Sequence, residues 1–80
     1  MSKTFAFRFS GDVVGARLKK VFSQQFVAEA AGISVREYQR IEKGIRQPRA
    51  ETFLRLIFIL ELDIEHYREV VFPYMPPLPR

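Results

Sequence analysis

Residues 23–44 read SQQFVAEAAGISVREYQRIEKG, and this stretch decides the fold. Ser23 is a favourable N-cap, because its side-chain oxygen can accept a hydrogen bond from a free backbone N–H at a helix start. The apolar spacing that follows predicts a short helix over residues 24–31. Gly32 then suits the left-handed conformation that ends a helix without a side-chain clash.

A second short helix is predicted directly after this glycine turn. Ser34 is its N-cap, and Glu37, three residues later, completes the pattern of a capping box. The helix extends over residues 34–43, and Gly44 stops it. Two short helices joined by a tight glycine turn predict a helix-turn-helix unit.

The packing of such a unit assigns the side chains to two faces. Ala28 is small where the second helix crosses over the first, and Val27, Tyr38 and Ile41 point inward. The outward stripe of the second helix is spaced i, i+3, i+4 and i+7. It consists of long hydrogen-bond donors without an acid: Arg36, Gln39, Arg40 and Lys43.

The sequence before this unit alternates strictly between apolar and other residues. Residues 3–9 place Phe5, Phe7 and Phe9 on one face, which predicts a β-strand. The run Ser10-Gly11-Asp12 breaks that pattern and offers helix-capping oxygens. A helix is expected to follow, with its apolar stripe at Val14, Leu18, Val21 and Phe22.

After the unit, residues 51–60 predict a fourth helix that is apolar almost all round. Asp63 caps an expected fifth helix from residue 64 to about residue 72. The tail over residues 73–80 has four prolines and cannot be regular helix. We divide the chain into an N-terminal strand or arm, a helix-turn-helix domain, and a helix end with a proline-rich tail that is a candidate for dimerisation: residues 1–11, 12–67 and 68–80.

Composition excludes several classes of protein. Eighty residues make one small domain, and the absence of cysteine excludes disulfides and thiolate metal sites. His66 alone cannot supply a zinc site, so we expect no metal and no cofactor. Neither a glycine-rich phosphate loop nor an acid–base pair is evident, so we expect no enzyme. Without a signal peptide or a membrane-spanning run, a cytoplasmic location is expected.

The charge is distributed unevenly along the chain. The net charge is +4, and residues 12–49 hold eight bases against four acids, whereas residues 50–80 hold three bases against five acids. A basic central segment suits a polyanion such as double-stranded DNA, although charged helix faces are often only solvated.

These residues resemble one known family, the lambda-repressor and Cro-like helix-turn-helix proteins of the XRE type. The resemblance runs from about Asp12 to Tyr67. It rests on Ser23-Gln24, Val27-Ala28, Gly32-Ile33-Ser34, Ile41-Glu42-Lys43-Gly44, Arg46, Pro48, Phe53, Leu56, Leu60 and Leu62. It implies an all-α domain of five helices, whose third helix enters the major groove, usually in a homodimer on a pseudo-palindromic operator.

The resemblance also implies roles for individual residues. The expected base contacts come from the recognition helix: Val35, Arg36, Gln39 and Arg40. The expected phosphate contacts are Gln24, Ser34, Lys43 and Arg46. Arg17 falls where the family pairs an arginine with the glutamate equivalent to Glu42, as a structural ion pair. Independently, an arginine can donate two hydrogen bonds to guanine and a glutamine can bond adenine, while Val35 could contact only a thymine methyl.

Two features depart from the family. Large apolar residues stand at positions 57–59, where the family generally has small or polar residues, and the phenylalanine strand has no counterpart. We hypothesise that these surfaces form a dimer through Phe5, Phe7, Phe9, Phe58, Val71 and Phe72. Alternatively, the extra residues only enlarge a monomer's core, or Lys3 and Arg8 form an arm that reaches into a DNA groove.

The sequence thus predicts a DNA-binding transcriptional regulator, a repressor that occupies an operator as a homodimer, without a small-molecule ligand or a membrane partner. The alternative is a protein-binding module of the same fold, an antitoxin or an antirepressor. The bulky fourth helix and the proline-rich tail favour that alternative.

Overall fold

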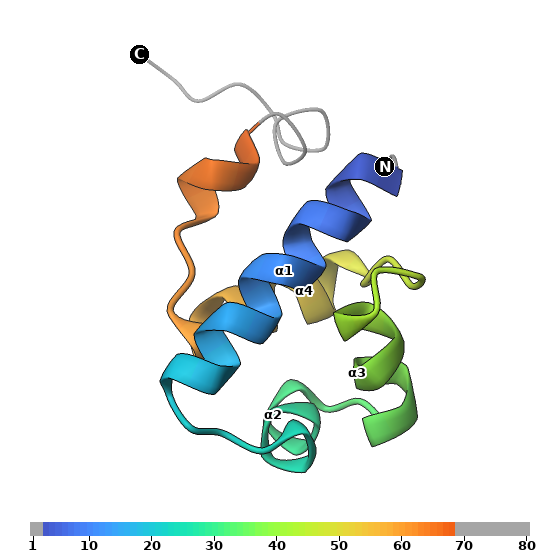
Figure 1. Ribbon diagram of the computed structural model, residues 1–80, viewed down its shortest axis with the longest axis vertical. Helices are drawn as coiled ribbons and strands as arrows, with labels where there is room; N and C mark the ends of the chain where they lie inside the picture. Colours follow the sequence, from blue (N-terminus) through green and yellow to red (C-terminus); the bar gives the residue numbers. More distant parts are fainter. Residues whose placement is uncertain (1–2, 69–80) are drawn as a thin grey trace.

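A computed structural model describes residues 3–68 of the chain, which form four α-helices and one 3₁₀ turn (Figure 1). The elements are α1 (Lys3–Lys19), α2 (Gln24–Ala31), α3 (Val35–Glu42), α4 (Ala50–Leu60) and η1 (Ile64–Tyr67). The all-helical class is therefore confirmed within residues 3–68. No helix in this range combines the length and the apolar character that a membrane crossing requires.

The predicted N-terminal strand is wrong, because residues 3–9 form the first half of α1. The alternation of phenylalanines is compatible with both structures, since Phe5 and Phe9 are also one helical turn apart. In the helix these two rings face the core with 3% and 1% exposure, whereas Phe7 lies on the opposite face at 76% exposure. An apolar run this short fits both the two-residue repeat of a strand and the 3.6-residue repeat of a helix.

The predicted break after residue 9 does not occur either. The Ser10 hydroxyl donates to the Phe7 carbonyl one turn earlier at 2.7 Å, so it is satisfied within the helix. Each glycine inside a helix costs about 1 kcal/mol relative to alanine. In α1 this cost at Gly11 is offset by burying Phe9 and Val13. Helix α1 is therefore not interrupted at Ser10-Gly11-Asp12, where a break was predicted, and it spans the predicted boundary between residues 11 and 12.

The inward face of α1 also differs from the predicted stripe. Val13, together with Phe5 and Phe9, faces the core, while Leu18 and Val21 are 61% and 88% exposed. Val21 has a φ of +58°, which ends α1 in the left-handed region. Of the other two residues in the predicted stripe, Val14 is half-buried, and Phe22 packs against the core beyond the end of α1.

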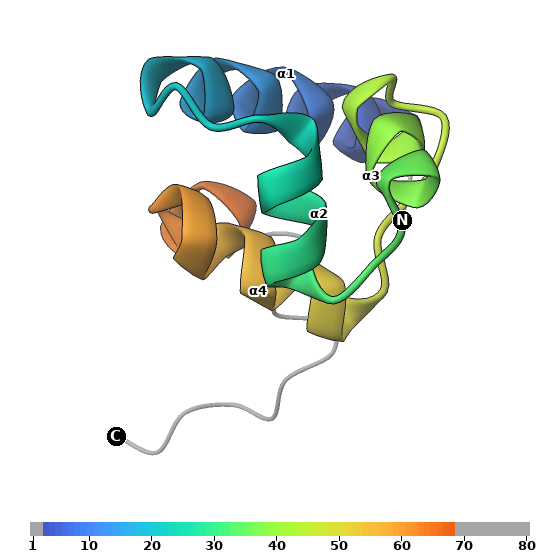
Figure 2. The same cartoon turned by 90° about the horizontal axis from the view of Figure 1, so that it is seen from below.

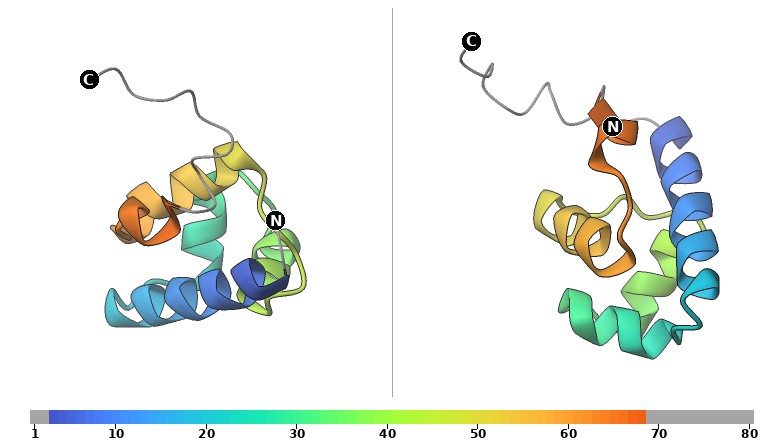
Figure 3. Two further views of the ribbon diagram at one scale, coloured as in Figure 1. Left: turned by 90° about the horizontal axis from the view of Figure 1, so that it is seen from above. Right: turned by 90° about the vertical axis from the view of Figure 1, so that its left-hand side faces the viewer.

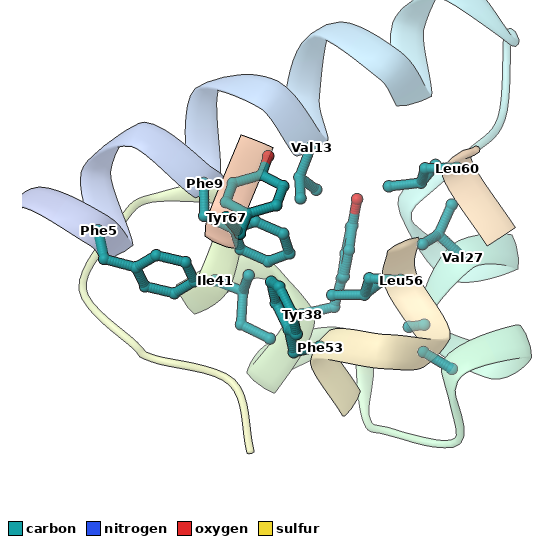
Figure 4. Close-up of a cluster of buried hydrophobic side chains, with 12 residues drawn as sticks. Phe5, Phe9, Val13, Val27, Tyr38, Ile41, Phe53, Leu56, Leu60 and Tyr67 are labelled. Atoms are coloured by element: carbon teal, nitrogen blue, oxygen red, sulfur yellow. The ribbon is translucent and has the colours of Figure 1, made fainter. Parts of the chain in front are cut away.

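Four aromatic rings form the part of the core between α1, α4 and η1 (Figure 4). Phe9 lies 5.1 Å from Phe53 and 5.4 Å from Tyr67 between ring centroids, and Phe5 stacks on Phe9 at 5.5 Å. Tyr67 is 1% exposed and donates its hydroxyl hydrogen bond to Asp12. Burial, followed by this hydrogen bond, raises the pKa of the Tyr67 hydroxyl. This cluster fixes α1 against the rest of the domain.

Within the described residues, the predicted fifth helix begins at Ile64 as the 3₁₀ turn η1, capped by Asp63 as expected. The remainder of that helix and the proline-rich tail lie outside the described residues. Helix α4 buries Phe53, Leu56 and Leu60 but leaves Phe58 85% exposed, so residues 3–68 leave one face of α4 uncovered.

The helices enclose the core from different sides. Figure 2 shows α2 standing roughly across the direction of α1, with α3 beside the N-terminal half of α1 and α4 on the other side of the core. The left view of Figure 3 shows α2 between α1 and α4, and the right view shows η1 between α4 and the N-terminal half of α1. This arrangement leaves the outer face of α3 unobstructed within residues 3–68.

Candidate nucleic-acid interface

The turn between α2 and α3 is built from the local signals of the sequence. The Ser23 hydroxyl accepts a hydrogen bond from the Phe26 N–H at 3.0 Å, and the Ser34 hydroxyl accepts one from the Glu37 N–H at 3.0 Å. Gly32 has a φ of +74° and its N–H bonds the Glu29 carbonyl at 3.1 Å. The two helices therefore begin and end within about one residue of their predicted bounds, as is usual for helix ends.

Gly32 is required by its backbone conformation, because a φ of +74° lies in the left-handed region that side chains disfavour. A Cβ at this position would lie 2.9 Å from Nη1 of Arg55, which itself donates to the Ala31 carbonyl at 3.2 Å. The Arg55 side chain of α4 therefore packs against the turn between α2 and α3 and satisfies a carbonyl at the end of α2. Sequence reasoning missed this contact, because nothing in the local pattern links Arg55 to a turn more than twenty residues away.

The inner faces of α2 and α3 pack as predicted. Val27, Ala28, Tyr38 and Ile41 are each at most 1% exposed. Ala28 has no side chain beyond Cβ, which allows the second helix to approach closely where the two elements cross. Because these four side chains are fixed in the core, the orientation of the opposite face of α3 is fixed as well.

The opposite face of α3 presents the predicted basic stripe. Arg36, Arg40 and Lys43 are exposed, and Gln39 between them is half-buried. Within the described part of the chain, neither arginine nor Lys43 has an ion-pair or hydrogen-bond partner for its side-chain nitrogens. Their donors are therefore available to an acceptor outside the protein.

The other predicted contact residues lie around this stripe. Gln24 is half-buried at the start of α2, and Ser34 is exposed at the start of α3. Arg46 is exposed in the loop after α3, with Nη2 4.0 Å from Oε1 of Glu37, a distance that leaves the guanidinium largely free. Val35 is only partly exposed, because it also packs against the core.

Arg17 of α1 and Glu42 of α3 form an ion pair that is largely shielded from solvent. Nε and Nη2 of Arg17 donate to the two carboxylate oxygens at 2.5 Å and 3.2 Å, and the side chains are 14% and 7% exposed. Burial acts to raise the pKa of Glu42. The hydrogen bonds that Glu42 accepts from Arg17 and Gln24 outweigh this effect and hold its pKa below the ordinary value. The pair ties the end of α3 to α1.

The Tyr38 hydroxyl lies in the core without a hydrogen-bond partner among the described residues. Burial, followed by the nearby carboxylate of Glu42, raises its pKa. Tyr38 is 0% exposed and belongs to the core, as predicted, rather than to a surface that stacks on bases.

The predicted dimerisation residues separate into three groups. Phe5 and Phe9 are buried in the core of a single chain, so this assignment is corrected: neither ring is available to a partner in this fold. Phe7 and Phe58 are 76% and 85% exposed, on α1 and α4. Val71 and Phe72 lie outside the described residues.

An apolar groove between α2 and α4 was not predicted as a unit. It has a volume of about 600 Å³ and is lined mainly by Phe22, Phe26, Ile57, Phe58 and Leu62. The signal available in the sequence was the unusual bulk at positions 57–59, which indicated an uncovered face of the fourth helix. It did not indicate that Phe26 of α2, and Phe22 just before α2, would lie beside that face.

One comparison with known proteins agrees with this geometry. Residues 16–66, more than half of the chain, match a family model described as helix-turn-helix. The chain therefore belongs to the helix-turn-helix family, and the resemblance to XRE-type proteins of the lambda-repressor and Cro-like kind is confirmed. These are DNA-binding regulators. No curated protein and no solved structure matches the chain.

Proposed function

We propose that this protein recognises a specific DNA sequence by inserting α3 into the major groove, and that it represses transcription by occupying a pseudo-palindromic operator as a homodimer. The observation that carries the proposal is the exposed stripe of Arg36 and Arg40, whose donors have no partner in the described chain. Each guanidinium offers the two parallel donors that match N7 and O6 of guanine. Gln39 and Val35 complete the base-contacting set, and Lys43, Arg46, Gln24 and Ser34 supply phosphate contacts.

Replacing both arginines tests this proposal directly. Selection from a random DNA pool gives the preferred site, and binding of Arg36→Ala/Arg40→Ala is then measured on it. One good bidentate pair discriminates by about 1–3 kcal/mol, so the double variant loses roughly tenfold or more in preference over random DNA. Unchanged affinity and selectivity in the folded variant would refute the proposal.

A conservative variant separates base contact from charge. Arg36→Lys/Arg40→Lys keeps both charges but removes the planar fork that bonds guanine twice. We expect it to lose selectivity while keeping a similar salt dependence, since log affinity falls with log salt by about 0.9 per phosphate contacted. Equal loss of binding to all sequences would assign the arginines to phosphates instead.

The homodimer is proposed from the exposed rings of Phe7 and Phe58 and from the two-fold symmetry that a pseudo-palindrome requires. Sedimentation of the full chain over a range of concentrations measures the association, and Phe58→Ser is expected to weaken it. Deleting residues 1–9 does not test this point, because it removes two core rings. A dimer unaffected by changes at both exposed rings would exclude these surfaces.

A second function is favoured by the groove between α2 and α4, which offers uncovered apolar surface to another protein. In this case the domain acts as an antitoxin or antirepressor. Salt-dependent binding to random duplex DNA separates the two functions, because a protein-binding module shows almost no such binding.

A further inference from the structure

Two glutamine side chains link the Arg17–Glu42 ion pair at the end of α3 to the exposed face of the same helix. Gln24 of α2 donates from Nε2 to Oε1 of Glu42 at 2.9 Å. Gln39 of α3 donates from Nε2 to Oε1 of Gln24 at 3.1 Å. Because Glu42 also accepts two hydrogen bonds from Arg17, a continuous chain of hydrogen bonds runs from α1 to the recognition face.

The direction of every hydrogen bond in this chain is determined by Glu42. An ionised carboxylate can only accept, so the Gln24 amide must turn its NH₂ group toward it. The Gln24 carbonyl oxygen then faces Gln39, which must in turn present its own NH₂ group. Reversing either amide would place two acceptors about 3 Å apart, an arrangement without a hydrogen bond.

Burial prevents water from replacing the hydrogen bonds between Arg17 and Glu42, where the hydrogen-bonded chain begins. The Glu42 and Arg17 side chains are 7% and 14% exposed, and a charge so shielded is costly to leave without its hydrogen bonds. Gln24 and Gln39 are half-buried, so the far end of the chain reaches solvent at the face of α3. Among the described residues, the Gln39 carbonyl oxygen and one of its two N–H groups have no partner.

We propose that Gln24 and Glu42 are positioning residues that make Gln39 select adenine over guanine. Adenine presents an acceptor at N7 and a donor at its N6 amino group in the major groove, which match one N–H and one carbonyl oxygen. Guanine presents two acceptors, N7 and O6, and a matching amide would need both of its N–H groups. Gln24 already occupies one of them. This inference rests on the proposed function, because it requires α3 to lie in the major groove.

Gln24 has a second predicted role that the experiment must separate from this one. Its spare N–H can donate to a DNA phosphate. A phosphate contact carries no sequence information, so its loss weakens all sites equally. Loss of positioning instead changes the ratio between two sites that differ at one base pair, and this ratio is the quantity to measure.

The first experiment locates the base pair and then removes the positioning contact. Sites selected from a random pool by the wild type and by Gln39→Ala are compared, and the position at which a preference disappears is assigned to Gln39. Wild type is expected to prefer A·T over G·C there by roughly 5- to 150-fold. Gln24→Met keeps the length of the side chain but cannot bond either neighbour, and we expect this ratio to fall to about twofold or less.

Gln25→Met is the matched control, because Gln25 is the next residue of α2 and donates only to Glu29 on the same helix at 3.1 Å. It should keep the wild-type ratio. The double variant Gln24→Met/Gln39→Ala should lose no more selectivity at this position than Gln39→Ala alone, since both changes remove one shared contact. Thermal melting verifies that each variant is folded, and Gln24→Ala replaces Gln24→Met if that protein does not fold.

Base analogues give a readout that folding cannot alter. At the assigned position, 7-deazaadenine lacks the N7 acceptor and purine lacks the N6 amino group, and each should weaken binding of wild type but not of Gln24→Met. Diaminopurine adds an amino group only in the minor groove, so it should leave binding by wild type unchanged.

The outcomes distinguish this inference from the proposed function. If Gln24→Met retains the preference for adenine, or if Gln39→Ala changes no position of the selected site, the inference is overturned while recognition by Arg36 and Arg40 stands. If wild type enriches no sequence from the random pool, the proposed function fails and the inference fails with it.

Discussion

The contrast between Phe9 and Phe7 gives the most direct test of the fold. In the helix Phe9 is 1% exposed and Phe7 is 76% exposed, whereas a strand would place both rings on one face. Phe9→Leu keeps an apolar side chain but loses ring contacts with Phe5, Phe53 and Tyr67, which lie 5.1–5.5 Å away. The three contacts share one ring, so their contributions are not additive. Counting about one aromatic pair, roughly 0.5–1.5 kcal/mol beyond burial, and roughly 0.5 kcal/mol for the smaller side chain, we expect a loss of about 1–2 kcal/mol.

For a domain of this size, 1 kcal/mol corresponds to about 4–8 °C in Tm, so Phe9→Leu should lower Tm by roughly 4–16 °C. Phe7→Leu should change the free energy of unfolding by no more than about 0.5 kcal/mol. Thermal unfolding followed by circular dichroism at several protein concentrations measures both, since a dimer contribution at Phe7 would depend on concentration. Equal, concentration-independent losses in the two variants would refute the helical assignment of residues 3–9.

Two further substitutions test the ion pair and the end of α1. The pKa of Glu42 is lower in the folded state than in the unfolded state, so its ionised carboxylate stabilises the fold. This stabilisation is complete above the ordinary glutamate pKa of about 4.3 and is lost as the pH falls from there through the lower folded-state pKa. Glu42→Gln should lower stability at neutral pH and flatten this acid dependence in melts from about pH 3 to about pH 7, whereas Glu61→Gln, at an exposed carboxylate, should change stability little. Val21 holds a left-handed φ of +58° at 88% exposure, so Val21→Asn should raise stability by about 1 kcal/mol in urea unfolding. An unchanged or lower midpoint for Val21→Asn would show that Val21 is not strained.

The helix-turn-helix unit could be predicted because its determinants are local. Ser23, Gly32 and Ser34 each act within about four residues through a cap or a left-handed turn, and the structure contains each of these features. The exposed stripe follows from the same local geometry, since positions three and four apart share a helix face. Such signals do not depend on the rest of the chain.

The start of the chain could not be predicted in the same way, because its determinants are distant. Phe5 and Phe9 are helical on account of the rings of Phe53 and Tyr67, which lie more than forty residues away in sequence. Alternation over seven residues fits a strand and a helix almost equally well, and two glycines inside α1 weaken the helical signal further. Tertiary packing decided between the two structures.

The hydrogen-bonded chain at the recognition face lies between these cases. The spacing of Gln39 and Glu42 on one helix is visible in the sequence, and so is the position of Gln24 at the start of the preceding helix. Only the crossing of the two helices brings Gln24 between them, so a residue expected to touch phosphate also determines which groups Gln39 offers to a base. A recognition helix therefore cannot be reduced to its outward residues: the groups that a glutamine presents depend on what its inner neighbours have already bonded.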